Sequence, residues 1–248
     1  MDVCVLITKV EYAVKLRIRF TKLEQSIYLS HLDIQRIFQL VLRMADIKVT
    51  YSKGFNPHIK MSFVSALGVG INSICECLDL ECADFETNNY RDIIERINDK
   101  LIYGIKVLSI KYLDFEKEKK ENYILDRCDY IIELLDSNED IKCMFDNFLS
   151  KNNIPYIKQN KKKIEKEINI KEGILEYRYL EKINALGKFL NEYIPLNKSS
   201  NYFYLKLKSG NNNLSPNTLI KAFIESNFDI KYNIYRINML NKYDKEIY

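Results

Sequence analysis

The pattern of apolar and polar positions predicts a strand and then a helix near the start of the chain. Residues 15–20 alternate between basic and apolar side chains, as in a half-buried strand, which places Arg17 and Arg19 on its polar face. A helix is predicted to begin after Ser30, because Ser30 can act as its N-cap and Asp33 completes a capping box. Apolar residues at helical spacing form its expected buried face: Ile34, Ile37, Phe38, Val41, Met44 and Ala45.

The pattern continues with strands and one more helix up to residue 113. Gly54 and Pro57 mark a loop. Strands are predicted over 60–66, 75–82 and 105–112, with a turn at 68–73 and a helix over 90–101. The resulting order, β-α-β-β-α-β, is that of a ferredoxin-like unit.

The second half of the chain resembles this order with longer insertions. Strands are predicted over 130–135, 202–208 and 234–240, with a further one starting at 155–159, and helices over 141–152 and 216–226. Residues 161–181 fit either one strand or a strand and a turn. We therefore predict an α+β fold of two tandem ferredoxin-like halves, 1–113 and 123–248, joined by a charged linker over 114–122. The sheets are expected to be mainly antiparallel, with helices on one face.

Composition and charge indicate a folded globular protein rather than a strongly basic one. The chain has 248 residues, of which 47% are hydrophobic, and a net charge of +4, which permits nucleic-acid contact without indicating it. The N-terminal apolar run is interrupted by Lys9 and Glu11, so neither a secretory signal nor a membrane span is expected. We expect a cytoplasmic protein whose six cysteines are reduced.

The polar face of the first strand has two interpretations. The neighbouring strand of a ferredoxin-like sheet carries Asp79 and Glu81, which favours cross-strand ion pairs with the basic residues. Alternatively, Arg17 and Arg19 form an open basic platform for phosphates. The nearby cysteines Cys75, Cys77 and Cys82 lack metal-ligand spacing, so we interpret them as small core residues and expect no metal site.

The two histidines of the chain are candidates for acid–base chemistry. His31 follows a helix N-cap and His58 follows the loop at Pro57, and together they could form the pair of a metal-independent endoribonuclease. Lys53 or Lys60 would then stabilise the developing charge. The alternative is that both imidazoles are structural, with His31 hydrogen-bonded at the helix start and His58 in the loop.

The predicted first helix also carries a polar stripe with a local positive excess. Arg36 and Arg43 lie seven residues apart on one face, and Lys48, Lys53 and Lys60 follow in sequence. Arginine side chains suit phosphate recognition, whereas an ordinary solvated helix face is the competing interpretation.

Four segments of the first half stand out as motifs: RIRFTK at 17–22, LSHLD at 29–33, YSKGFNPHIKMSF at 51–63 and LGVGINSICECLDLE at 67–81. Together they resemble the radical SAM-linked protein family, a bacterial domain of unknown function that is fused to, or encoded beside, a radical S-adenosylmethionine enzyme. The family usually has proline where Ile59 stands. The resemblance covers about the first hundred residues well and the rest loosely.

The resemblance implies an accessory role in RNA modification. The chain would bind RNA and act with a radical SAM enzyme on tRNA or rRNA, with no cofactor of its own. S-adenosylmethionine and an iron–sulfur cluster would belong to that partner enzyme, and contact with DNA or a membrane is not expected. The expected RNA- or partner-binding residues are Arg17, Arg19, His31, Arg36, Arg43, Lys53, Asn56 and His58. The endoribonuclease and a protein–protein adaptor without RNA contact remain alternatives.

Overall fold

A computed structural model describes most of the chain, in these ranges: 13–83, 90–135, 139–159, 165–181, 188–194, 197, 199–210, 213–224 and 230–248. The N-terminal apolar run lies outside the described residues. In the described part, no helix combines the length and the apolar composition that a membrane span requires.

The first half follows the predicted order of elements, which are listed here with their bounds: β1 Val14–Lys22, the 3₁₀ turn η1 Glu24–Tyr28, α1 His31–Met44, β2 Met61–Phe63, β3 Asn72–Cys82, α2 Tyr90–Asn98 and β4 Val107–Tyr112. The strands lie in the order β4-β1-β3-β2, and every pair is antiparallel. β2 is shorter than the predicted strand over 60–66, and β3 is longer than the predicted strand over 75–82.

The second half contains more elements than predicted: η2 Lys120–Tyr123, β5 Arg127–Leu134, α3 Glu139–Ser150, β6 Pro155–Gln159, β7 Glu165–Asn169, η3 Ile170–Gly173, β8 Ile174–Tyr179, α4 Lys188–Tyr193, β9 Asn201–Lys208, α5 Pro216–Ile224 and β10 Tyr232–Leu240. Strands β10, β5, β9 and β8 are neighbours in that order. The ambiguous stretch over 161–181 contains two strands: β7 pairs with β6 in a separate hairpin, and β8 forms the sheet edge.

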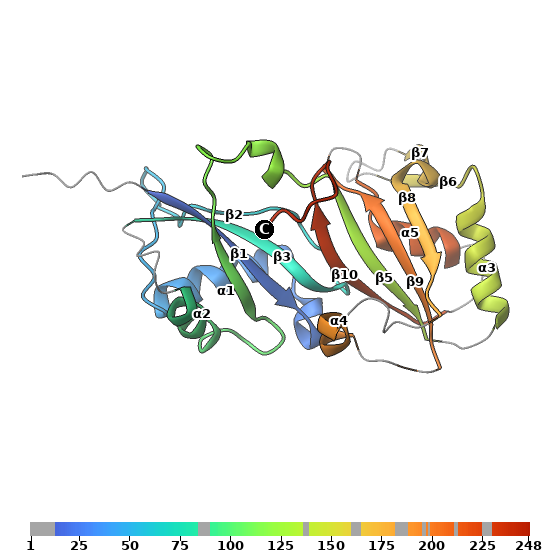
Figure 1. Cartoon of the computed structure of the whole chain (residues 1–248), viewed down its shortest axis with the longest axis horizontal. Coiled ribbons are helices and arrows are strands. Elements are labelled where there is room, and N and C mark those ends of the chain that lie inside the picture. Colours follow the sequence, from blue (N-terminus) through green and yellow to red (C-terminus); the bar gives the residue numbers. More distant parts are fainter. Residues whose placement is uncertain are drawn as a thin grey trace, which may run out of the picture.

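One continuous sheet runs through both halves, because β3 and β10 pair in parallel at Asn72–Tyr235 and Ser73–Arg236. Its order is β4-β1-β3-β10-β5-β9-β8, with β2 beside β3 (Figure 1). This is the one parallel pairing within the described sheet. The fold is therefore mixed α+β with a mainly antiparallel sheet, as predicted.

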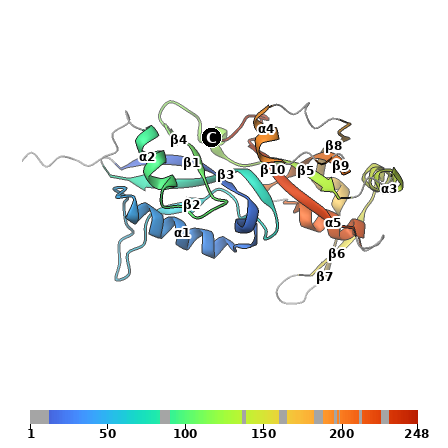
Figure 2. The ribbon, with the colours of Figure 1, turned by 90° about the horizontal axis from the view of Figure 1, so that it is seen from below.

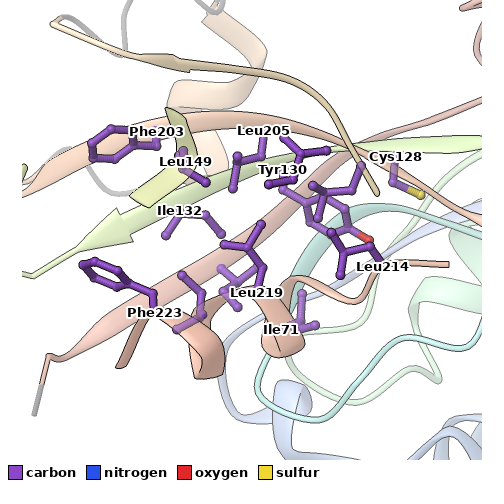
Figure 3. Close-up of a cluster of buried hydrophobic side chains, with 14 of the residues drawn as sticks. Ile71, Cys128, Tyr130, Ile132, Leu149, Phe203, Leu205, Leu214, Leu219 and Phe223 are labelled. Atoms are coloured by element: carbon purple, nitrogen blue, oxygen red, sulfur yellow. The ribbon is translucent and has the colours of Figure 1, made fainter. Parts of the chain in front are cut away.

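The core is divided between the two faces of this sheet. Under the first half, α1 and α2 pack on β1 and β3, and the rings of Phe20 and Phe38 lie 4.7 Å apart. Under the second half, α3 and α5 pack on β5 and β9, and Ile71 from the first half joins this cluster (Figure 3). The short helix α4, which was not predicted, packs on the opposite face of the sheet through Leu190 (Figure 2). The expectation of helices on one face is therefore wrong for α4.

Local sequence determines the start of α1. The Ser30 side chain accepts from the backbone N–H of Asp33, and the Asp33 carboxylate accepts from the backbone of Ser30, which confirms the predicted capping box. The Ser30 hydroxyl also donates to the Asp33 carboxylate at 2.6 Å, and this hydrogen bond, followed by that from the Ser30 backbone, lowers the pKa of Asp33. One predicted core residue is wrong: Met44 is mainly exposed at the last turn, while Leu42 is buried instead.

Candidate nucleic-acid interface

The outward face of α1 presents two arginines to solvent. Arg36 is exposed and lies 3.6 Å from Asp33, one turn back along the helix. Arg43 is also exposed, and its Nε donates to the backbone oxygen of Gln39 at 2.9 Å. An ion pair this open is weakened by water and salt, so Arg36 can exchange its carboxylate partner for a phosphate. The predicted polar stripe on α1 therefore exists and is accessible.

A projecting hairpin loop, residues 51–59, lies beyond the C-terminal end of α1 (Figure 2). Its base is closed by a bridge between Tyr51 and Ile59 and by a hydrogen bond of 2.8 Å from the N–H of Ser52 to the oxygen of His58. The tip turns at Gly54, whose φ of +138° is in the region that favours glycine. The short closed base holds the tip residues away from the core.

The tip of the hairpin loop exposes an aromatic ring between polar side chains. Phe55 is completely exposed, and Lys53, Asn56 and His58 around it are also exposed. Lys53 forms no ion pair with any described carboxylate. Burial of apolar surface stabilises folded proteins, so an aromatic side chain held fully in water at a turn contributes nothing to this fold. Such a ring, with a lysine cation two residues away, is suited to stacking on an unpaired nucleobase.

The two histidines lie in different environments. The His31 ring packs edge-on against Phe63 with centroids 4.9 Å apart, at the N-terminal end of α1. His58 is exposed, and its backbone N–H donates to Ser52 Oγ at 3.0 Å. His31 begins α1 and His58 lies in the hairpin loop beyond the other end of α1, so a helix of 14 residues, roughly 21 Å long, lies between them. This geometry does not bring them together as an acid–base pair.

Arg17 and Arg19 are buried, so the open basic platform is a wrong expectation. The Arg17 guanidinium donates to both carboxylate oxygens of Asp79, at 2.6 and 2.9 Å, and to backbone oxygens of Tyr123 and Ile247. The C-terminal segment and the segment that follows β4 cover this face of β1. Arg17 is therefore a structural residue, in agreement with the predicted cross-strand pairing.

Arg19 is covered in a similar way. Its Nε donates to the oxygen of Ile74 at 3.1 Å, and its guanidinium stacks 3.8 Å from the centroid of the Tyr248 ring and donates to the Tyr248 hydroxyl. A guanidinium engaged by an aromatic face and two protein acceptors is not available to a phosphate.

Sequence reasoning missed a buried charged cluster beneath the N-terminal end of α1. Glu76 on β3 accepts from Arg236 Nη1 at 3.1 Å and from Ser73 Oγ at 2.6 Å, and all three residues are buried. Lys22 lies nearby with its ammonium on the oxygen of Leu29 at 2.9 Å, and burial lowers its pKa while Glu76 opposes that shift. A small cavity of about 10 Å³ lined by Lys22, His31 and Glu76 has room for no more than about one water.

No local pattern identifies this cluster as a unit, because Glu76 and Arg236 are 160 residues apart. A usable signal was the presence of Lys22, His31 and Glu76 in three of the four segments that resemble the radical SAM-linked family. The burial of Lys22, Glu76 and Arg236 makes the cluster a structural junction.

The three cysteines of β3 lie in the core. Within the described residues no group of three or more histidine, cysteine or acidic side chains is placed to hold a metal ion. Cys75, Cys77 and Cys82 are buried among apolar residues, and burial raises the pKa of Cys77 and Cys82 from 9.0 to about 12. Protonated thiols of this kind are poor metal ligands, which agrees with their interpretation as core residues.

Comparison with known proteins gives a family match. A family model described as an uncharacterized protein conserved in bacteria (DUF2344) matches residues 15–216 of the chain. No curated protein matches the chain.

Solved structures give only weak likenesses. The chain is similar to a chain of a Cbf5-Nop10-Gar1 complex, with 8% identity, a TM-score of 0.45, and coverage of 92% of this chain and 50% of that one. It is also similar to an unknown protein from Galdieria sulphuraria, with 9% identity, a TM-score of 0.25, and coverage of 91% and 99%. A putative glycine cleavage system transcriptional repressor gives 9% identity, a TM-score of 0.23, and coverage of 93% and 99%. At these TM-scores the function has to be argued from the chain's own residues.

Proposed function

This chain belongs to the family of uncharacterized proteins conserved in bacteria whose model matches residues 15–216, and we propose that it is an accessory RNA-binding module that acts with a radical SAM enzyme in tRNA or rRNA modification. The RNA-binding surface consists of the outward face of α1, with Arg36 and Arg43, and the hairpin loop 51–59, with Lys53, Asn56 and His58. His31 lies at the other end of α1. Radical chemistry, S-adenosylmethionine and the iron–sulfur cluster belong to the partner enzyme.

The observation that supports this proposal is the fully exposed Phe55 at the tip of a closed hairpin, two residues from the exposed cation of Lys53. Cations attract the phosphate backbone through a salt-dependent term, and an aromatic ring adds stacking on an unpaired base. Double-stranded DNA offers no unstacked base to such a ring, so an unpaired loop of RNA is the better ligand.

The proposed fold assignment follows from the strand orders. Each half has two helices on its strands and the order fourth-first-third-second, if the β6–β7 hairpin and α4 are treated as insertions in the second half. We assign both halves to the ferredoxin-like pattern, joined through β3 and β10. The hairpin loop is then an extension of the first half, between α1 and β2.

A titration of fluorescein-labelled tRNA against salt, followed by anisotropy, tests RNA binding. We expect the logarithm of the association constant to fall steeply with the logarithm of salt concentration. Arg36→Gln together with Arg43→Gln should reduce that slope by about one for each lost phosphate contact. Phe55→Ala should weaken binding about tenfold and leave the slope unchanged, because stacking releases no counterion.

The matched control is Lys151→Gln with Lys221→Gln, which removes one exposed cation just after the end of α3 and one on α5. This variant should bind tRNA as the unmodified protein does. A flat salt response, or an equal loss in the control and in the α1 variant, would contradict a localised RNA-binding surface.

A specific observation also favours contact with a protein partner on α1. Leu32, Leu40 and Met44 are each more than half exposed and share the outward side of the helix with the two arginines. We expect Leu40→Asp to reduce co-purification with the proposed radical SAM partner enzyme, with RNA affinity retained. Co-purification unchanged by Leu40→Asp would place the partner contact elsewhere on the chain.

A further inference from the structure

A large groove lies beside η1. It has a volume of about 790 Å³ and is formed where η1, the turn between α2 and β4, helix α4 and the start of β10 meet. Figure 1 shows α4 beside the segment that follows β1, at the boundary between the two halves. This volume is in the range of small-molecule sites, whereas the cavity at His31 has a volume of only about 10 Å³.

A close backbone contact holds two walls of the groove together. The N–H of Leu23 donates to the oxygen of Gly104 at 2.9 Å, and a Cβ at Gly104 would lie 2.2 Å from the oxygen of Leu23. Gly104 also has a φ of +89°, so its conformation and the space around it both favour glycine. This contact places Tyr103 next to the η1 segment that carries Tyr28.

The walls of the groove carry exposed aromatic rings. Tyr28 is 71% exposed and Tyr103 is 79% exposed, and both line the groove. A tyrosine ring has a flat apolar face and few rotatable bonds, so it binds planar heterocycles at a low entropy cost.

The floor of the groove carries amide groups from both halves. Asn72 lies next to Tyr235, because β3 and β10 pair at these two residues. Asn233 precedes Tyr235 by two residues on β10 and also lines the groove. The Asn72 amide nitrogen donates to the oxygen of Ile234, and no described group donates to its amide oxygen. That oxygen is therefore an acceptor for an amino or imino group at the groove floor.

The charge of the groove distinguishes it from the hairpin loop. Glu24 and Glu192 line it against a single cation, Lys106, so phosphate is disfavoured there. Aromatic walls, an amide floor and carboxylates at the sides are suited to a planar, neutral heterocycle that donates hydrogen bonds. Nucleobases have this chemistry, with the phosphate left outside.

We propose that the groove lined by Tyr28, Tyr103 and Asn72 binds one unstacked nucleobase. This inference rests on the proposed RNA-binding function for its source of bases, and a free nucleoside has the same ring chemistry. RNA held at the hairpin loop through its backbone would present a base to the groove. The groove then selects among bases. Neither the phosphate contacts nor stacking on Phe55 provides this specificity.

The chain contains no tryptophan, so a single introduced tryptophan reports on one place only. Three reporter variants are required: Tyr103→Trp in the groove, Phe55→Trp on the hairpin loop, and Tyr112→Trp on β4 as a control outside both. Each is titrated with single-stranded RNA oligonucleotides, and separately with adenosine, guanosine, cytidine and uridine. We expect quenching of Tyr103→Trp by RNA and by at least one nucleoside, and none in Tyr112→Trp.

A second measurement uses the same RNA with Tyr103→Ala and with Tyr112→Ala. We expect about a tenfold loss of affinity in the first variant, which lies in the range for one base–aromatic stack, and no change in the second. Circular dichroism and thermal melting identify any variant that has failed to fold, in which case Tyr28→Ala replaces Tyr103→Ala.

The outcomes separate the two proposals. Quenching of Phe55→Trp by RNA, with Tyr103→Trp silent to RNA and nucleosides, overturns the groove proposal and leaves the RNA-binding function standing. Quenching of Tyr103→Trp by a nucleoside without any RNA binding supports the groove as a nucleoside site and overturns the RNA-binding function. Silence of all reporters to RNA and nucleosides overturns both.

Discussion

At the residue scale, the candidate arginines of this chain differ in burial, and their local sequence does not reveal that difference. Arg17 lies on an alternating strand and Arg36 on a helix stripe, and both were candidates for phosphate contact. The structure closes Arg17 between Asp79 and two backbone oxygens, while Arg36 remains 75% exposed. The difference arises from segments remote in sequence, since Ile247 is 230 residues from Arg17. Strand periodicity does not reveal such a cover.

The Arg17–Asp79 pair leads to a stability prediction. Asp79→Ala leaves a buried guanidinium without its carboxylate, so the free energy of unfolding should fall by about 3–5 kcal/mol. Glu81→Gln is the control, because Glu81 lies on the same strand as Asp79. Its ion pair with Lys60 is partly exposed and should contribute no more than about 1 kcal/mol. Urea denaturation followed by circular dichroism measures both changes. Equal losses in the two variants would refute the assignment of Arg17 as a structural residue.

At the element scale, predictability follows the distance between interacting residues. The start of α1 could be predicted because Ser30 and Asp33 are three residues apart. For β3, alternation predicts one buried and one polar face, yet residues 73–80 are all buried. The reason is that β10 pairs with its first residues while Arg17 and the C-terminal segment cover its polar side. The hairpin loop was predicted as a break at Gly54 and Pro57, but the exposure of Phe55 at its tip was not.

The turn between α2 and β4 gives a prediction about one close contact. Gly104→Ala should lower the free energy of unfolding by more than Gly70→Ala does. Both positions have positive φ, +89° and +81°, so alanine is strained at each by about 1–2 kcal/mol. Only at Gly104 does a Cβ meet a backbone oxygen, which adds about 1–3 kcal/mol of overpacking, whereas nothing lies within 4 Å at Gly70. Urea midpoints for the two variants provide the comparison, and a larger loss at Gly70 would contradict it.

The buried thiols of β3 predict a loss of stability in alkali. Burial raises the pKa of Cys77 and of Cys82 from 9.0 to about 12. Between these values the folded chain keeps protons that the unfolded chain releases, so their contribution is present below pH 9 and is lost as the pH rises towards 12. Each thiol contributes a slope of up to about 1.4 kcal/mol per pH unit.

Urea denaturation at pH 8.5, 9.5 and 10.5 should therefore show a steeper fall for the unmodified protein than for Cys77→Ala with Cys82→Ala. Cys143→Ala serves as the control, since its thiol is exposed and its loss should leave the slope unchanged. A parallel fall in all three proteins would assign the alkaline loss to other groups, such as the buried tyrosines.

At the scale of the whole molecule, two segments with the same strand order form one sheet, and the order could be predicted more readily than the junction. Within each half, the contacts join residues that are at most about a hundred positions apart in the sequence. Hydrophobic periodicity predicts the strands and helices that make these contacts. The junction is a short parallel pairing of β3 with β10, between residues 163 positions apart, together with Ile71 in the core of the second half. The groove and the buried Glu76–Arg236 pair both arise at this junction, so neither could be located from the sequence alone.

The Glu76–Arg236 pair is expected to couple the two halves during unfolding. Each side chain is about 95% buried, and the pair joins β3 to β10 at 3.1 Å. Glu76→Ala leaves Arg236 buried beside Tyr130 without a carboxylate, which should cost about 3–5 kcal/mol and weaken the junction selectively. Hydrogen exchange should then give different opening free energies for the amides of β1 and of β9, which we expect to be equal in the unmodified protein.

The double variant Glu76→Leu with Arg236→Met tests whether the missing charge partner or the altered packing is responsible. Apolar side chains of similar volume often replace a buried ion pair without loss, so this variant should restore equal opening free energies in β1 and β9. If hydrogen exchange in the double variant still gives different opening free energies for β1 and β9, the pair acts through its specific hydrogen bonds with Ser73 and Tyr130. If Glu76→Ala leaves β1 and β9 coupled, the junction is held by Ile71 and the apolar core, and the buried charges are not required for it.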